Sequence, residues 1–176
     1  MQSPDSYGVR VNQKISDQVS VGASKAKVML VDEDGVSSNN DFTSAWLSTS
    51  HLINGNTLKT SSIWAQTRDS NSQSLNSFLE EVVYQLGKNK FFGRVEVLQI
   101  APNQLNIVVT DGKTGAQWVK AYTAGYERTL VASKNYKIFA GGSYTKNTVP
   151  VEFQPNYGTS PNGLKVFLRM NWAINN

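Results

Sequence analysis

The sequence predicts an all-β protein, an antiparallel up-and-down transmembrane β-barrel with about nine strands in the chain. Three observations lead to this prediction. Apolar and polar residues alternate with a period of two along most of the chain, the connections between these segments are short and long in turn, and every proline lies outside these segments. Residues 1–176 are interpreted as a single β-barrel domain.

The two-residue period marks nine segments. They are residues 6–14, 19–30, 41–52, 57–68, 78–88, 91–100, 118–130, 136–146 and 164–173. Most exceed the five or six residues usual in globular strands. They match the roughly 9–11 residues that a tilted strand needs to cross a bilayer. The length of the segments therefore favours strands that span a membrane.

One segment is also compatible with a helix. In SLNSFLEEVVYQLG, residues 74–87, Leu75, Phe78, Leu79, Val82 and Leu86 fall near helical spacing. However, apolar residues also alternate there with polar ones, and Val-Val-Tyr favours extended backbone. We therefore predict a strand.

The connections alternate in length. ISDQ, INGN, KN and VASKN are tight turns, whereas VDEDGVSSNN, DSNSQSLNS, APNQLNIVVTDGKTGAQ and NTVPVEFQPNYGTSPNG are long and mostly polar. Tight periplasmic turns and longer outer loops are typical of bacterial barrels. Proline cannot donate a hydrogen bond to a β-ladder. The prolines accordingly all lie outside the predicted strands: Pro4, Pro102, Pro150, Pro155 and Pro161.

The alternation predicts a polar inside and an apolar outside, the inverse of a soluble barrel. In the last segment, lipid-facing positions are predicted for Leu164, Val166, Leu168, Met170 and Trp172. Charged lumen-facing positions are predicted for Glu81, Arg94, Glu96, Glu127, Lys165 and Arg169, and Gln99 is also placed inside. These charges either line a pore and set its selectivity, or pair with one another and fill a narrow lumen. In a barrel of about ten to twelve strands the second interpretation is favoured, because side chains nearly occlude so narrow an interior.

Aromatic residues gather at both ends of the predicted strands. Phe91, Tyr136 and Trp172 lie near the tight turns, and Trp118, Tyr122 and Tyr144 lie near the long connections. Two such bands predict the interfacial girdles of a membrane barrel. The alternative is that these rings plug a soluble barrel or sandwich.

The amino-acid composition argues against several classes of function. The net charge is +4, but the basic residues are scattered singly, so no nucleic-acid partner is predicted. There is no cysteine, and His51 is the only histidine, which leaves little material for a metal cluster or a histidine-based triad. We therefore predict no catalytic residue, metal or cofactor, and no enzymatic activity.

Four stretches resemble the C-terminal strands of Gram-negative outer-membrane β-barrel proteins, a poorly characterised porin-like group. They are FLEEVVYQLGKNKFFGRVEVLQ, YTAGYERTL, KIFAGGSYTKNTVP and NYGTSPNGLKVFLRMNW. The resemblance implies a location in the bacterial outer membrane, with the lipid bilayer as one partner. It also implies an insertion signal in the last strand, read by the barrel-assembly machinery. The residues that resemble this signal are Gly163, Val166, Leu168 and Trp172.

The expected function is that of a porin-like or transport-related passive channel. A plugged barrel with a structural or adhesive role and a soluble ligand-binding β-barrel are the alternatives, and no oligomeric state is assigned. The first ten residues lack the basic and apolar regions of a signal peptide, so we expect a mature form or a C-terminal fragment. Since bacterial barrels have even strand numbers, we expect the chain to be the C-terminal portion of a barrel of ten or more strands.

Overall fold

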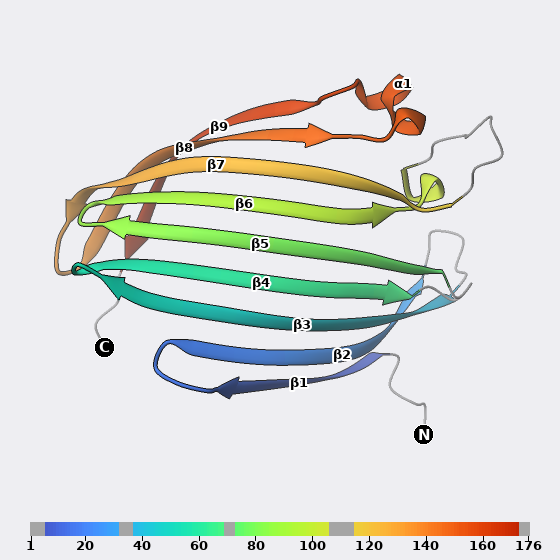
Figure 1. Ribbon diagram of the computed structural model, residues 1–176, viewed down its shortest axis with the longest axis horizontal. Coiled ribbons are helices and arrows are strands. Elements are labelled where there is room, and N and C mark those ends of the chain that lie inside the picture. The colour runs from blue at the N-terminus through green and yellow to red at the C-terminus, as the bar shows by residue number, and fades with distance from the viewer. Residues whose placement is uncertain (1–5, 32–36, 69–72, 106–114, 173–176) are drawn as a thin grey trace.

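The computed structural model describes residues 6–31, 37–68, 73–105 and 115–172, which form one antiparallel sheet of nine strands in sequence order (Figure 1). The strands are β1 Ser6–Lys14, β2 Val19–Val31, β3 Ser37–Ile53, β4 Asn56–Arg68, β5 Ser74–Leu86, β6 Asn89–Ile100, β7 Gln117–Ala132, β8 Tyr136–Thr148 and β9 Asn162–Trp172. Each strand is hydrogen-bonded to its neighbours in sequence. The prediction of an all-β, up-and-down antiparallel fold that forms a portion of a barrel is confirmed.

The strand boundaries depart from the predicted ones in instructive places. β5 begins at Ser74, before the predicted residue 78, because Leu75 and Asn76 continue the ladder against β4. β5 also rules out the helical alternative. Lys88 was predicted to end this strand, but it lies with Gly87 in a two-residue turn, where Gly87 has a φ of 56°. Ala173, predicted to end the last strand, lies outside the described residues.

Tight turns fix the register at one end of the sheet. Asn54 and Gly55 join β3 to β4 with φ values of 51° and 78°. Positive φ at both central residues is the requirement of the hairpin turn that matches the twist of the strands, and Asn-Gly satisfies it at low cost. Residues 101–105, after β6, and residues 149–161, between β8 and β9, lie at the other end of the sheet (Figure 1).

Three short helical segments were not predicted. They are η1 Pro102–Leu105, η2 Val151–Phe153 and α1 Gln154–Tyr157. They lie among the long connections, where Phe153 is 1% exposed and packs with Val149 against Ile100, Leu105 and Val119. This cluster is a small hydrophobic core at the rim of the sheet. Among the described residues, no helix is long and apolar enough to cross a membrane.

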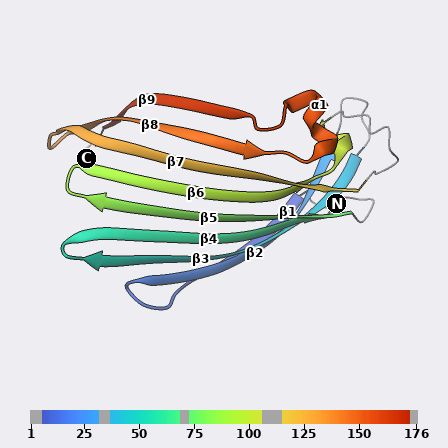
Figure 2. The same ribbon diagram turned by 45° about the horizontal axis from the view of Figure 1, so that its top comes forward.

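The sheet curves across its strands, so that it has a convex and a concave face (Figures 1 and 2). Along β7, Tyr122, Ala124 and Tyr126 are exposed on the convex face, whereas Thr123 is partly shielded and Glu127 is buried on the concave face. Cross-strand partners share a face. The register therefore assigns the paired strand residues to one face or the other, while a β-bulge between Thr129 and Val131 leaves Leu130 unpaired.

The register corrects one face assignment. Gln99 is paired with Trp118 and alternates in step with Val97 and Val95, so it lies on the convex face. The prediction that it points inward was wrong, because residues an even number of positions apart in a regular strand share a face. There the Gln99 side chain accepts hydrogen bonds from the backbone and the side chain of Asn76, at 2.8 and 3.1 Å.

Candidate functional site: the charged concave wall

The predicted lumen-facing charges all lie on the concave face. Glu81 comes from β5, Arg94 and Glu96 from β6, Glu127 from β7, and Lys165 and Arg169 from β9. We call the concave side of β5 to β9 the concave wall. It gathers charged side chains from strands that are far apart in the sequence.

Glu127 is the centre of the wall. It is 5% exposed, and its Oε1 lies 2.6 Å from Lys90 Nζ and accepts a hydrogen bond from Arg169 Nη2 at 2.9 Å. Lys90 is the register partner of Glu127 on β6. A buried carboxylate needs such partners, because an unpaired buried charge is very unfavourable. Sequence reasoning missed Lys90, since its pairing with Glu127 depends on the register of β6 against β7.

Gly141 allows Arg169 to reach Glu127 across an entire strand. Gly141 on β8 is the register partner of both Glu127 on β7 and Phe167 on β9. A Cβ atom at Gly141 would lie 2.7 Å from Phe167 Cζ and would collide with the backbone oxygen of Tyr126. With no side chain on β8 at this point, the arginine from β9 and the carboxylate from β7 meet over it.

A second charged group lies on β5 and β6. Arg94 forms an ion pair with Glu96, two residues along β6, and is the register partner of Glu81 on β5. The Arg94 and Glu96 side chains are 41% and 34% exposed, so water screens this pair far more than the Glu127 cluster. One cation facing two carboxylates leaves this group net negative.

Aromatic rings cover glycines along the concave face. Phe92 lies against Gly125 and Trp46 against Gly22, so closely that a Cβ atom on either glycine would overlap the ring. Both are direct cross-strand pairs. An aromatic ring over a strand glycine replaces the missing side-chain packing. Arg10 adds a cation–π contact, with its Cζ 4.5 Å from the centroid of the Trp46 ring.

The concave wall contains a hollow of about 430 Å³. Its lining combines three cations with two aromatic rings and two carboxylates: Glu81, Val83, Lys90, Phe92, Glu127, Lys165, Phe167 and Arg169. Lys165 Nζ lies 5.9 Å from the centroid of the Phe167 ring, and Arg169 Cζ lies 4.6 Å from that of Phe139. The hollow is thus a charged surface with apolar patches.

The predicted girdle residues lie on the convex face. Phe91 contacts Tyr126 with ring centroids 5.2 Å apart, and Tyr136 contacts Trp172 with centroids 6.3 Å apart. At the other end Trp118 lies 6.2 Å from Phe78. Tyr122 and Tyr144 are 45% and 48% exposed. Their action as interfacial girdles stays a prediction.

Three of the four residues that resemble an insertion signal share one face of β9. Val166, Leu168 and Trp172 are 80%, 73% and 70% exposed on the convex face. Gly163 is paired with Thr145 and belongs to the concave face. Their recognition by an assembly machinery stays a prediction.

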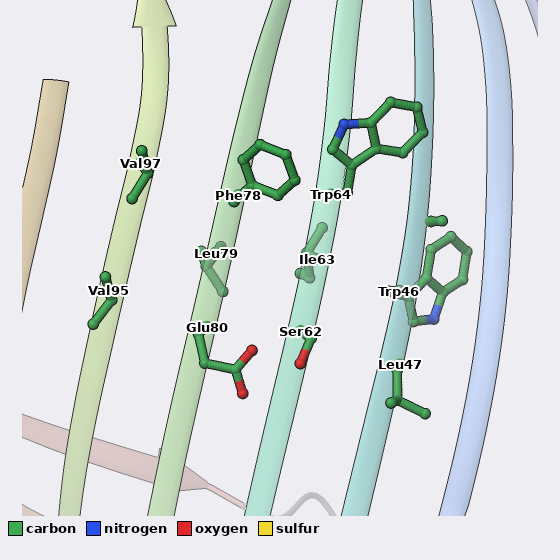
Figure 3. A pocket seen from close by; sticks show the side chains of 11 residues that line it. Trp46, Leu47, Ser62, Ile63, Trp64, Phe78, Leu79, Glu80, Val95 and Val97 are labelled. Atoms are coloured by element: carbon green, nitrogen blue, oxygen red, sulfur yellow. The ribbon is translucent and has the colours of Figure 1, made fainter. Parts of the chain in front are cut away.

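A second hollow, of about 540 Å³, lies on the convex face over β3 to β6 (Figure 3). Trp64, Phe78 and Leu47 form much of its apolar lining, and Glu80 extends toward Ser62 between them (Figure 3). Glu80 and Glu81 thus lie on opposite faces of β5, so they are not a paired acid and base.

Comparison with known proteins gives one structural match. No protein-family model matches the chain, and no curated protein matches it in sequence. The crystal structure of the outer-membrane porin OpdQ from Pseudomonas aeruginosa is similar, with a TM-score of 0.57 at 15% sequence identity. The match covers 90% of this chain and 42% of that one, so this chain spans less than half of the porin. The likeness establishes the fold: the nine strands are arranged like part of a porin barrel.

Proposed function

We propose that the sheet is part of the wall of an outer-membrane β-barrel that acts as a porin-like passive channel. One observation carries the proposal. The concave face is charged, while the convex face of β9 exposes a continuous apolar row, Leu164 to Trp172, of which Val166 is 80% exposed. A soluble barrel has the opposite arrangement, whereas a membrane barrel has lipid outside and water inside.

The edges of the sheet support a larger barrel. β1 and β9 run in the same direction, because they are separated by an odd number of antiparallel strands. Joining them directly would pair them in parallel. Antiparallel closure therefore requires an odd number of further strands, which agrees with the even strand counts of bacterial barrels. We propose that residues 1–176 form one portion of a barrel of ten or more strands.

The structural likeness supports the same function. The chain shares the fold of part of the porin OpdQ, although its sequence identity of 15% carries no information about a solute. Location in the outer membrane, and insertion through the exposed apolar face of β9, belong to the same proposal. The barrel-assembly machinery is the proposed partner during insertion.

Planar-bilayer recording tests the channel directly. The full-length protein, purified in detergent and shown to be folded by heat-modifiable mobility on gels, is added to a bilayer. Stepwise conductance increases that require the folded form are expected. Folded protein that inserts without conductance would contradict the channel.

A second candidate function, a closed structural barrel, is favoured by a specific feature. Phe153 and Leu105, from two long connections, pack on the concave residues Ile100 and Val119. The connections therefore reach over the concave face at one end of the sheet and narrow the opening there. Inserted but non-conducting protein is the result expected for this alternative.

A further inference from the structure

We infer that the concave face of the sheet favours the passage of small anions, an inference that rests on the proposed channel. The charges of the described strands supply the first argument. Eight basic residues belong to the concave face by register: Arg10, Lys14, Lys59, Lys90, Arg94, Lys137, Lys165 and Arg169. The acidic residues on that face of the described strands are Glu81, Glu96 and Glu127. Subtracting three negative charges from eight positive charges leaves a net charge of +5.

The pairing of these charges supplies the second argument. Glu127 neutralises only one of the two cations that it holds, because a carboxylate carries a single negative charge and both Lys90 and Arg169 contact it. Lys14 is neutralised by Asp17 in the adjoining turn, 2.6 Å away. Lys165 and Lys59 have no ion-pair partner within the part of the chain that the structure describes. Unpaired ammonium groups at a water-filled wall attract anions and repel cations.

The excess positive charge is not spread evenly over the concave face. Three cations, Lys90, Lys165 and Arg169, and two carboxylates, Glu81 and Glu127, line the hollow of about 430 Å³, which leaves a net charge of +1 there. Arg94 and Glu96 neutralise each other, so the excess positive charge at the hollow comes from Lys90 on β6 and from Lys165 and Arg169 on β9. A small anion moving along this wall therefore meets the ammonium of Lys165 beside the guanidinium of Arg169.

The test is the ratio of chloride to potassium permeability, measured from the reversal potential of the full-length protein in a potassium chloride gradient. Wild-type protein is expected to favour chloride. Lys165→Glu and Lys59→Glu are each expected to lower the ratio by about two- to fivefold, because charge reversal changes the interaction with an ion several ångströms away by two elementary charges. Both side chains are exposed, so the variants are expected to fold.

Matched controls reverse a lysine on the other face. Lys120→Glu and Lys146→Glu change the charge on the convex face and are expected to leave the ratio unchanged. A wild-type ratio at or below one, unchanged ratios in the concave variants, or equal changes in the convex controls would overturn the anion preference while leaving the channel intact. A folded, inserted protein with no conductance would overturn the channel and this inference together.

Discussion

Arg169 on β9 donates a hydrogen bond to Glu127 on β7 over a distance of 2.9 Å, across the strand that lies between them. This contact ties three strands together on the concave face, where Gly141 on β8 places no side chain between the two residues and the Phe167 ring lies over the glycine. Lys90 on β6 completes the cluster at 2.6 Å. The charged cluster of Glu127, Lys90 and Arg169 therefore contributes to the proposed ion preference and also stabilises the packing of these strands.

Glu127→Gln is expected to lower the free energy of unfolding by about 2 kcal/mol. Removing one member of a fully buried pair costs about 3–5 kcal/mol, and the 26% and 47% exposure of the Lys90 and Arg169 side chains reduces that cost. Urea unfolding in lipid vesicles measures it. Glu96→Gln is the control, since its pair is mostly screened by water, and its loss is expected to stay below about 1 kcal/mol. Equal losses in the two variants would contradict the central role of Glu127.

Gly141→Ala is expected to destabilise the sheet by about 1–3 kcal/mol, the usual cost of forcing extra volume into a packed site. The new Cβ would collide with backbone, the carbonyl oxygen of Tyr126, which moves less easily than a side-chain tip. Gly163→Ala is the control, because no atom lies within 4 Å of a Cβ built there. Thermal unfolding followed by circular dichroism compares the two. An unchanged melting temperature for Gly141→Ala would show that β7 and β8 are packed less closely than described.

Phe153→Ala is expected to release the connection between β8 and β9 while the sheet stays folded. Phe153 is 1% exposed, and truncating a buried phenylalanine costs about 3–5 kcal/mol. Limited proteolysis of the folded protein measures the effect, with faster cleavage expected between residues 149 and 161. Tyr157→Ala in the same segment is the control, because Tyr157 is 46% exposed. Cleavage at the wild-type rate in Phe153→Ala would contradict the anchoring role of this ring.

Val11→Arg is expected to impair folding into bilayers, whereas Asn12→Arg is tolerated. The two residues are adjacent on β1 and lie on opposite faces, with Val11 paired with Ala23 on the convex side and Asn12 with Gly22 on the concave side. An arginine facing lipid costs about 2–4 kcal/mol at the midplane and less toward the interfaces. The folded fraction in lipid vesicles, read from heat-modifiable mobility, measures the difference. Equal folding of both variants would argue for water on both faces.

The alternation of apolar and polar residues was sufficient to predict the nine-stranded fold. β1 matches its predicted limits because its alternation is clean and the turn at Ile15–Gln18 is rich in polar residues. The start of β5 was placed too late, since Ser74, Asn76 and Ser77 resemble a loop and are held extended by pairing with β4. At such positions, pairing with the neighbouring strand outweighs the low intrinsic β propensity of serine and asparagine.

The site was predictable only in part. Alternation placed Glu81, Glu127 and Arg169 on one face, but it contains no information about which strands face one another at which residue. The contact of Arg169 with Glu127 depends on the registers of β7, β8 and β9 together, and on a glycine at one point of β8. Lys90 was missed for the same reason, and Gln99 was assigned to the wrong face by a miscounted alternation.

Labelling of single cysteines in lipid vesicles tests the central claim, that the convex face contacts lipid and the concave face contacts water. The 176 residues contain no cysteine, so no residue of this chain contributes background reaction. Val166→Cys and Lys165→Cys place a thiol on adjacent residues of β9 that face opposite sides. A membrane-impermeant, charged thiol reagent is expected to modify Lys165→Cys and spare Val166→Cys, while a fluorophore at residue 166 alone is quenched by nitroxide lipids. Equal modification of both variants, without lipid quenching at residue 166, would contradict the claim.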